Sequence, residues 1–282
     1  MFKRSSSLII ASTFLLLTFL GATPALARSA LTFVSGKGAD SGTCASPSTP
    51  CRTFQFALGQ TSASGEIKAL DPADYSSVTI THSVTITGVE GAGIFQTANA
   101  DAITINAGPS DTINLSHLTL DGFKVSNFGM VFNSGASLTM THCSVRNFTT
   151  TGILIFPKGN TAFLIADTIV SNNNEGVAVV PQATGTAHGT IDHVIATSNL
   201  GIGIGTGGSG GPSTVQVVES IAAQNSIGFF VNSGKFLRLG HSAATGNGTG
   251  VEGSGKAESA GNNFIRGNGT DVSGHLTNIG IR

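Results

Sequence analysis

The stretch from Met140 to Phe156, MTHCSVRNFTTTGILIF, places a histidine directly before a cysteine. A thiol with an imidazole in reach can act as a nucleophile activated by a base. The same imidazole could instead be one of several ligands of a transition metal. Which of these chemistries His142 and Cys143 can perform depends on the structural elements that hold them.

Polar residues recur on both sides of His142 at intervals of 21 to 27 residues. Stacked on successive coils, imidazole and carboxylate groups could bind zinc, with His117, His142, Asp167 and His193 as candidate ligands. The same column also contains a serine and an asparagine, so a ladder of polar side chains at a bend explains it without a metal. We therefore predict a polar corner ladder, with no bound metal and no cofactor. The column comprises His117, His142, Asp167, His193, Ser220, His241 and Asn262.

A second column consists of glycines that follow asparagine-rich bends. An alternating apolar pair comes just after each glycine, as in Ile153 and Ile155, and period-two alternation indicates a strand with one buried face. The glycines are Gly129, Gly152, Gly176, Gly201, Gly228 and Gly250, with Asp271 in the next place; Ile202 and Ile204 are the pair assigned to Gly201.

The alternation slips at the polar column: Met140, Cys143 and Val145 are apolar, but Met140 and Cys143 are three residues apart rather than two. The chain must therefore turn a corner there, which gives three short strands per repeat. Such repeats predict an all-β fold, a right-handed parallel β-helix of about nine coils with three parallel sheets around an apolar core. Cys143 is then a small buried core residue, and we predict no catalytic residue in this stretch. Asparagines at the bends can hydrogen-bond to their copies one coil away; they are Asn127, Asn173, Asn174, Asn199, Asn225, Asn247 and Asn268.

Residues 1–27 have the pattern of a secretory signal peptide: Lys3 and Arg4, an apolar run, and the small residues of Ala25-Leu26-Ala27. We expect a secreted, periplasmic or cell-surface protein, since no later segment is long and apolar enough to span a bilayer. Without these residues, 12 Lys and Arg face 15 Asp and Glu, because only Lys3 and Arg4 are lost from the 14 cations. A formal charge of −3 offers no basic surface for nucleic acid.

Residues 28–65 precede the repeats and are expected to form an N-terminal strand, a disulfide loop and a capping helix. Cys44 and Cys51 lie seven residues apart in a Pro- and Ser-rich loop, and in an exported chain we expect them to form a disulfide. Thr49, Pro50 and Gly59 have the spacing of a helix with an N-cap, a first-turn proline and a terminal glycine. The parallel β-helix is expected over residues 66–282, without a linker.

These features resemble the exported bacterial right-handed β-helix proteins of the pectin-lyase-like superfamily. The resemblance is carried by Phe33-Val-Ser-Gly36, by Cys44 with Pro50-Cys51-Arg-Thr-Phe54, by the segment 65–72, and by the coils. It covers nearly the whole chain after residue 27. The superfamily includes polysaccharide lyases, hydrolases and epimerases, so the resemblance implies a fold rather than one activity.

The motifs of the enzymes in this superfamily are incomplete in the chain. Polygalacturonase-like enzymes need paired carboxylates, whereas here only Asn160-Thr161-Ala162 and Ala187-His188-Gly189 resemble their motifs. Ile191-Asp192-His193 matches part of a pectate lyase motif, without the accompanying arginine and proline. The 17 phenylalanines, without tryptophan and with Tyr75 alone, suggest core filling, and the charged residues are scattered over the repeats. We expect a non-catalytic surface, adhesion or envelope protein with weak polysaccharide contact; the alternative is a polysaccharide lyase or glycoside hydrolase with a divergent site.

Overall fold

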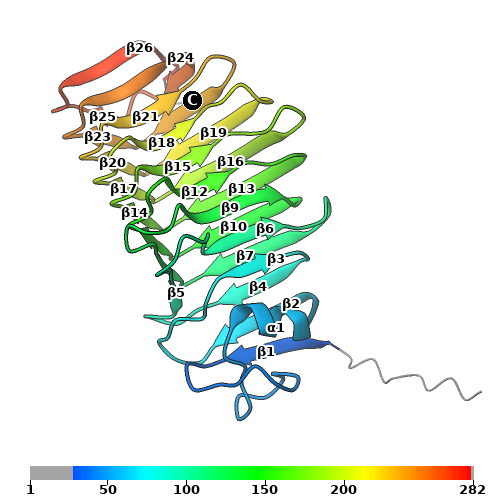
Figure 1. The fold of residues 1–282 in the computed structure, drawn as a ribbon. Helices are drawn as coiled ribbons and strands as arrows, with labels where there is room; N and C mark the ends of the chain where they lie inside the picture. The colour runs from blue at the N-terminus through cyan, green and yellow to red at the C-terminus, as the bar shows by residue number, and fades with distance from the viewer. Residues whose placement is uncertain (1–27, 281–282) are drawn as a thin grey trace, which may run out of the picture.

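A computed structural model describes residues 28–280 of the 282-residue chain. These residues form a β-solenoid of about eight turns, with each coil stacked on the preceding one from the N-terminal to the C-terminal end (Figure 1). The sequence predicted about nine coils. The expected signal peptide, residues 1–27, lies outside the described residues. Within the described part of the chain, no helix is both long and apolar enough to cross a membrane.

The strands pair in parallel with strands one coil away and build three faces. The first face contains β1 (Ser29–Val34), β2 (Thr61–Ala69), β4 (Val84–Thr87), β7 (Thr112–Ser116), β10 (Ser137–Thr141), β13 (Asn160–Ala166), β16 (Thr186–Asp192), β19 (Ser213–Val218) and β22 (Phe236–Gly240). The second face contains β3 (Val78–Ile80), β6 (Ile103–Asn106), β9 (Phe128–Ser134), β12 (Thr151–Ile155), β15 (Glu175–Val179), β18 (Ile202–Thr206) and β21 (Ile227–Val231). The third face contains β5 (Gly93–Phe95), β8 (Thr119–Asp121), β11 (Ser144–Arg146), β14 (Ile169–Ser171), β17 (Ile195–Thr197), β20 (Ile221–Ala223), β23 (Ala243–Thr245) and β25 (Phe264–Ile265).

Two long strands at the C-terminal end, β24 (Thr249–Ser259) and β26 (Thr270–Asn278), run across both the second and the first face. β24 pairs with β21 through its first half and with β22 through its second half. In the last coils, the chain therefore passes from the second face to the first within one continuous strand. The outer surfaces of β22, β24 and β26 lie next to each other.

The interior is filled by alternate residues of most strands. In β10, Leu138 and Met140 are buried while their neighbours are partly exposed, and in β12 Ile153 and Ile155 are buried on either side of the partly exposed Leu154. Burying each such side chain contributes about 1.5–3 kcal/mol relative to leaving it exposed. The period-two pattern therefore accounts for the closed apolar core of the solenoid.

A buried ladder of asparagine amides, which we call the inner ladder, runs along the turns between the third and second faces. Each amide nitrogen donates to the amide oxygen of the next member, as from Asn199 to Asn225 over 3.0 Å. The same oxygen accepts the backbone N–H of Asn199 at 2.9 Å. The predicted bonding between coils is confirmed for five asparagines, whereas Asn127 and Asn174 lie outside the ladder. Its members are Asn173, Asn199, Asn225, Asn247 and Asn268.

The aligned glycine of one coil was predicted wrongly. Val177 pairs with Ile204, so Gly203 rather than Gly201 stands beside Gly176. The bend after Asn199 contains one more residue than its neighbours and projects Leu200 into solvent, 75% exposed. This extra residue shifts the register, and the alternating pair is Ile204 and Thr206 rather than Ile202 and Ile204.

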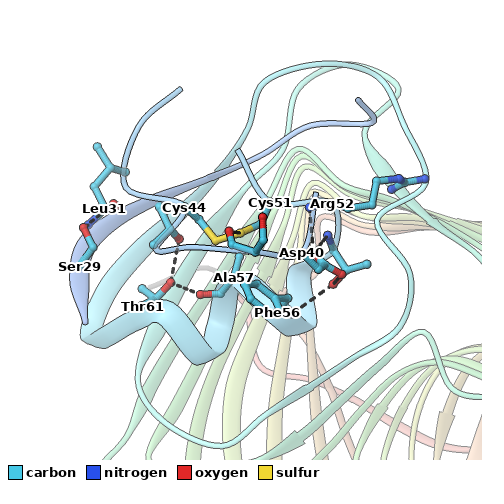
Figure 2. Close-up of a disulfide and its surroundings, with 12 residues drawn as sticks. Ser29, Leu31, Asp40, Cys44, Cys51, Arg52, Phe56, Ala57 and Thr61 are labelled. Atoms are coloured by element: carbon cyan, nitrogen blue, oxygen red, sulfur yellow. Dashed lines mark hydrogen bonds between the residues drawn. A yellow bond between two sulfur atoms is a disulfide. The ribbon is translucent and has the colours of Figure 1, made fainter. Parts of the chain in front are cut away.

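The N-terminal end of the solenoid is closed by α1 (Phe54–Gln60), whose residues Phe54, Ala57 and Leu58 are buried. Cys44 and Cys51 are joined by a disulfide beside this helix (Figure 2). The helix starts later than predicted: its N-cap is Thr53, not Thr49. Cys51 pairs with β1, because its N–H donates to Phe33 O at 2.9 Å, and backbone engaged in this way cannot form a first helical turn. Gly59 lies inside the helix instead of ending it.

Candidate functional site

The polar column lies at the corner between the first and third faces, and we call it the outer column. Its non-glycine members have a left-handed backbone, with φ between 48° and 57°. Strand pairing corrects one predicted member: Asp192 pairs with Val218, which places Glu219 rather than Ser220 next to His193. The outer column is Gly88, His117, His142, Asp167, His193, Glu219 and His241. Asn262, the predicted next member, lies beside His241 and accepts its backbone N–H at 3.0 Å through Oδ1.

The outer column brings its side chains together in pairs. The rings of His117 and His142 stack with their centroids 4.9 Å apart, and His142 Nε2 lies 3.9 Å from Asp167 Oδ2. His193 is held more closely, with Nδ1 at 2.9 Å from Asp192 and Nε2 at 2.7 Å from Glu219. Hydrogen bonding and charge from Asp192, together with the charge of Glu219, raise the pKa of His193.

Three of the four candidate ligands lie in a row, with His142 between His117 and Asp167, whereas His193 pairs with Asp192 and Glu219. Among residues 28–280, no three His, Cys, Asp or Glu side chains converge in a geometry that could hold a metal ion. The side chains of His142, Asp167 and His193 are about half exposed, so water satisfies the atoms that have no protein partner. The arrangement is that of an exposed ladder of ion pairs and stacked rings.

Cys143 lies beside this column but points inward. It is buried, and burial raises the pKa of its thiol to about 11. At neutral pH the thiol is protonated, whereas a nucleophilic cysteine needs the thiolate. Its sulfur donates to Thr141 O at 3.2 Å rather than contacting His142. The residue pair that suggested nucleophilic chemistry is thus divided between the core and the surface.

A groove of about 840 Å³ lies on the outer surface of the first face, over β19, β22, β24 and β26. Strand pairing aligns Phe236 with Lys256, and the pairing of Ala257 with Leu276 brings His275 close to them. The neighbouring column aligns Arg238, Glu258 and Thr277. These residues come from three successive coils, and Pro212 and Gly234 of the preceding turns border the groove.

Phe236 stands between two cations at the centre of this groove. The Arg238 guanidinium lies 5.2 Å from the ring centroid and Lys256 Nζ lies 5.0 Å from it. Both are within the range of cation–π attraction. The partly exposed Phe236 ring therefore presents an apolar surface among polar groups.

The charges around Phe236 are arranged about a single carboxylate. Arg238 donates to Glu258 Oε2 through Nε at 3.1 Å and through Nη2 at 2.8 Å, and Lys256 Nζ lies 3.0 Å from Oε1. These hydrogen bonds, from Lys256 and from Arg238, lower the pKa of Glu258. Lys235 is buried and donates to Gly210 O at 2.8 Å and to Gly211 O, and burial lowers its pKa.

The sequence did not predict this groove. Phe236 was included among the core phenylalanines, but it is outward-facing and only partly buried. The charged residues that seemed scattered along the chain converge here because parallel pairing places Lys256 beside Phe236 and Glu258 beside Arg238 on successive coils. One sequence signal could have indicated the groove. Phe236 and Arg238 are two residues apart on one strand, and Lys256 and Glu258 are two residues apart on the next.

Comparisons with known proteins agree with this architecture. No family model matches the chain, and no curated protein matches it. The crystal structure of pectate lyase Pel9A superposes with a TM-score of 0.61 over 91% of this chain and 78% of that one. This protein has a pectate-lyase-like parallel β-helix fold. The predicted fold class is confirmed, and at 14% identity the likeness concerns the fold alone.

Proposed function

We propose that this protein is an exported, non-catalytic β-helix that binds a polysaccharide in the groove around Phe236. The observation that carries the proposal is an outward-facing phenylalanine, fixed between Arg238 and Lys256 inside a groove on a regular sheet. Sugar rings have apolar C–H faces that pack on aromatic rings, and their hydroxyls find donors and acceptors in surrounding polar groups. Ser213, Thr214 and Thr277 supply such groups along the groove.

The groove lacks the constellation that hydrolysis of a glycosidic bond requires. Glycosidases use two carboxylates, one of them an acid with a raised pKa. Among the described residues, no Asp or Glu lines the groove, and the neighbouring Glu258 has both oxygens paired and a lowered pKa. This argues against hydrolysis in the groove and supports binding without turnover there; a role in adhesion or envelope structure is part of the proposal.

Export is part of the proposal. The Cys44–Cys51 disulfide supports it, because disulfides persist in oxidising compartments and are rare in the cytosol. The alternative, a polysaccharide lyase or glycoside hydrolase with a divergent site, rests on the fold that this chain shares with a pectate lyase.

The test is a binding screen of the protein from residue 28 onward against neutral and acidic polysaccharides, with reducing ends and unsaturated products measured in parallel. We expect binding without products, and a roughly five- to tenfold loss of affinity in Phe236→Ala, the effect of about 1 kcal/mol of aromatic contact. Phe230→Ala is the matched control, since Phe230 lies on the outer surface of the second face, paired with Gly205. Turnover of any glycan, or equal losses in both variants, would contradict the proposal.

A further inference from the structure

The cations of the Phe236 groove already have a resident anion. Both oxygens of Glu258 are occupied, one by two guanidinium N–H groups of Arg238 and the other by the ammonium of Lys256. The Glu258 side chain is only 9% exposed, whereas those of Arg238 and Lys256 are 43% and 68% exposed. The carboxylate thus lies beneath the two cations, on the protein side of the groove.

An acidic sugar would compete with Glu258 for these cations. To pair with Arg238 in a bidentate manner, a ligand carboxylate would have to displace a carboxylate that is largely buried. A buried carboxylate that loses its partners is strongly unfavourable. If Glu258 stayed in place, two like charges would share one pair of cations, which weakens binding further.

The third cation of the groove, Lys235, is not available to an acidic ligand either. Lys235 is buried, and its ammonium donates to the backbone oxygens of Gly210 and Gly211. Each Lys and Arg that lines the groove within the described part of the chain is therefore already paired. What remains accessible is the Phe236 ring, together with hydroxyl and backbone groups.

We infer that Glu258 is a specificity-determining residue, a built-in counter-ion that makes the groove select neutral glycans over acidic ones. The inference rests on the proposed glycan binding and adds the charge class of the ligand. Phe236 contacts the sugar, while Glu258 acts through Arg238 and Lys256 by keeping them from an anionic ligand. Removing its charge converts the same groove into a site for uronates.

The experiment compares two ligand pairs with the same sugar backbone and a neutral or a charged group at C6: polygalacturonate with its methyl ester, and cello-oligosaccharides with their C6-carboxylated form. The wild type is expected to bind the neutral member of a pair more tightly. Glu258→Gln keeps the shape and a hydrogen-bond acceptor, and is expected to gain about tenfold in affinity for the acidic member, equivalent to about 1.4 kcal/mol. Glu252→Gln, the same change on β24 but aligned with Phe230 on the second face, should leave the preference unchanged.

The double variant Arg238→Gln/Glu258→Gln should lose the gain, because the released guanidinium is what binds the acid. Should thermal melting show that Glu258→Gln does not fold, Glu258→Asp, which withdraws the carboxylate by one methylene, is expected to show a smaller gain. A wild type that prefers acidic members, or a preference unchanged in the Glu258 variants, would overturn the inference while leaving glycan binding intact. Absence of binding to every member would overturn the proposed function and this inference together.

Discussion

Two ladders run along the solenoid with the same one-coil spacing, and they differ in almost everything else. The inner ladder contains one residue type and repeats one geometry, with amide hydrogen bonds of 2.9–3.1 Å from Asn173 to Asn268. The outer column contains glycine, histidine, aspartate and glutamate, and its contacts range from 2.7 Å to 3.9 Å.

Burial explains the difference. A buried N–H or C=O must find a partner in the protein, and an asparagine both donates to one copy of itself and accepts from another. At the outer column, water can replace any missing partner, so the side chain is free to vary. Regular spacing along a solenoid therefore says little about function until the burial of the repeated residues is known.

The largest loss of stability is expected in the inner ladder, for Asn199→Ala. This change removes the acceptor of two donors of Asn173, its backbone N–H at 3.0 Å and its amide at 3.1 Å. Each buried donor left without a partner costs about 1–3 kcal/mol, so we expect the free energy of unfolding to fall by about 3 kcal/mol. Chemical denaturation measures it, with the exposed Asn174→Ala as control. A loss below about 1 kcal/mol would show that the inner ladder tolerates variation as the outer column does.

A sharper comparison is available at two adjacent residues, Ser220 and Glu219. The buried Ser220 hydroxyl accepts the Val194 N–H at 3.0 Å, and Ser220→Ala is expected to cost about 1–2 kcal/mol by leaving that donor unpaired. Glu219→Ala, in the outer column, should stay within about 0.5 kcal/mol of the wild type, as is usual for surface substitutions. Equal losses in denaturation experiments would contradict the placement of the Ser220 hydroxyl in the buried interior and of Glu219 in the exposed outer column.

The outer column should contribute a small dependence of stability on pH through His193. Its pKa is raised in the folded state by Asp192 and Glu219, so the stabilisation is complete below the ordinary value of about 6.5. It is lost as the pH rises through the folded-state pKa. Melting temperatures of the wild type and His193→Gln, measured from about pH 5 to about pH 9, should converge toward high pH. A difference that grew with pH would mean that the ring is held neutral instead.

The smallest effect on stability is expected for Asp271, which accepts the amide of Asn268, the last asparagine of the inner ladder. Asn268 donates its amide to Asp271 Oδ1 at 3.1 Å, and these hydrogen bonds lower the pKa of Asp271. The contribution is present above the ordinary value of 3.8 and is lost as the pH falls through the folded-state pKa. Asp271→Asn keeps an oxygen acceptor, so stability at neutral pH should barely change while the loss on acidification becomes smaller. Acid titration of both proteins, followed by circular dichroism, measures the difference.

Much of the fold was predictable because its signals are local in the sequence. Period-two alternation, together with the slip at Met140 and Cys143, was enough for three strands per coil and a buried Cys143. Errors of one or two residues arose at Ser220 and Gly201, where bends differ in length, because only pairing with the next coil fixes the register.

The groove around Phe236 was not predictable in the same way. Its character depends on which face of β22 points outward and on the alignment of residues about one coil apart. The start of α1 was missed for a related reason, since the pairing of Cys51 with β1 is a contact between distant residues. Alternation in the sequence describes a single strand, whereas the groove and the start of α1 both depend on how strands pair with one another.

The inner ladder also makes the coil a unit that can be added or removed. Asn199 and Asn225 make the same bonds to their neighbours, and 26 residues separate them. Deleting residues 199–224 would place Asn225 after Ser198 and bring it beneath Asn173, where the same amide contacts can form again. Duplicating the segment would lengthen the solenoid by one coil with every bond type preserved. The length of this protein is thus open to change by whole coils, through duplication or loss of a segment, without a new packing solution at the joint.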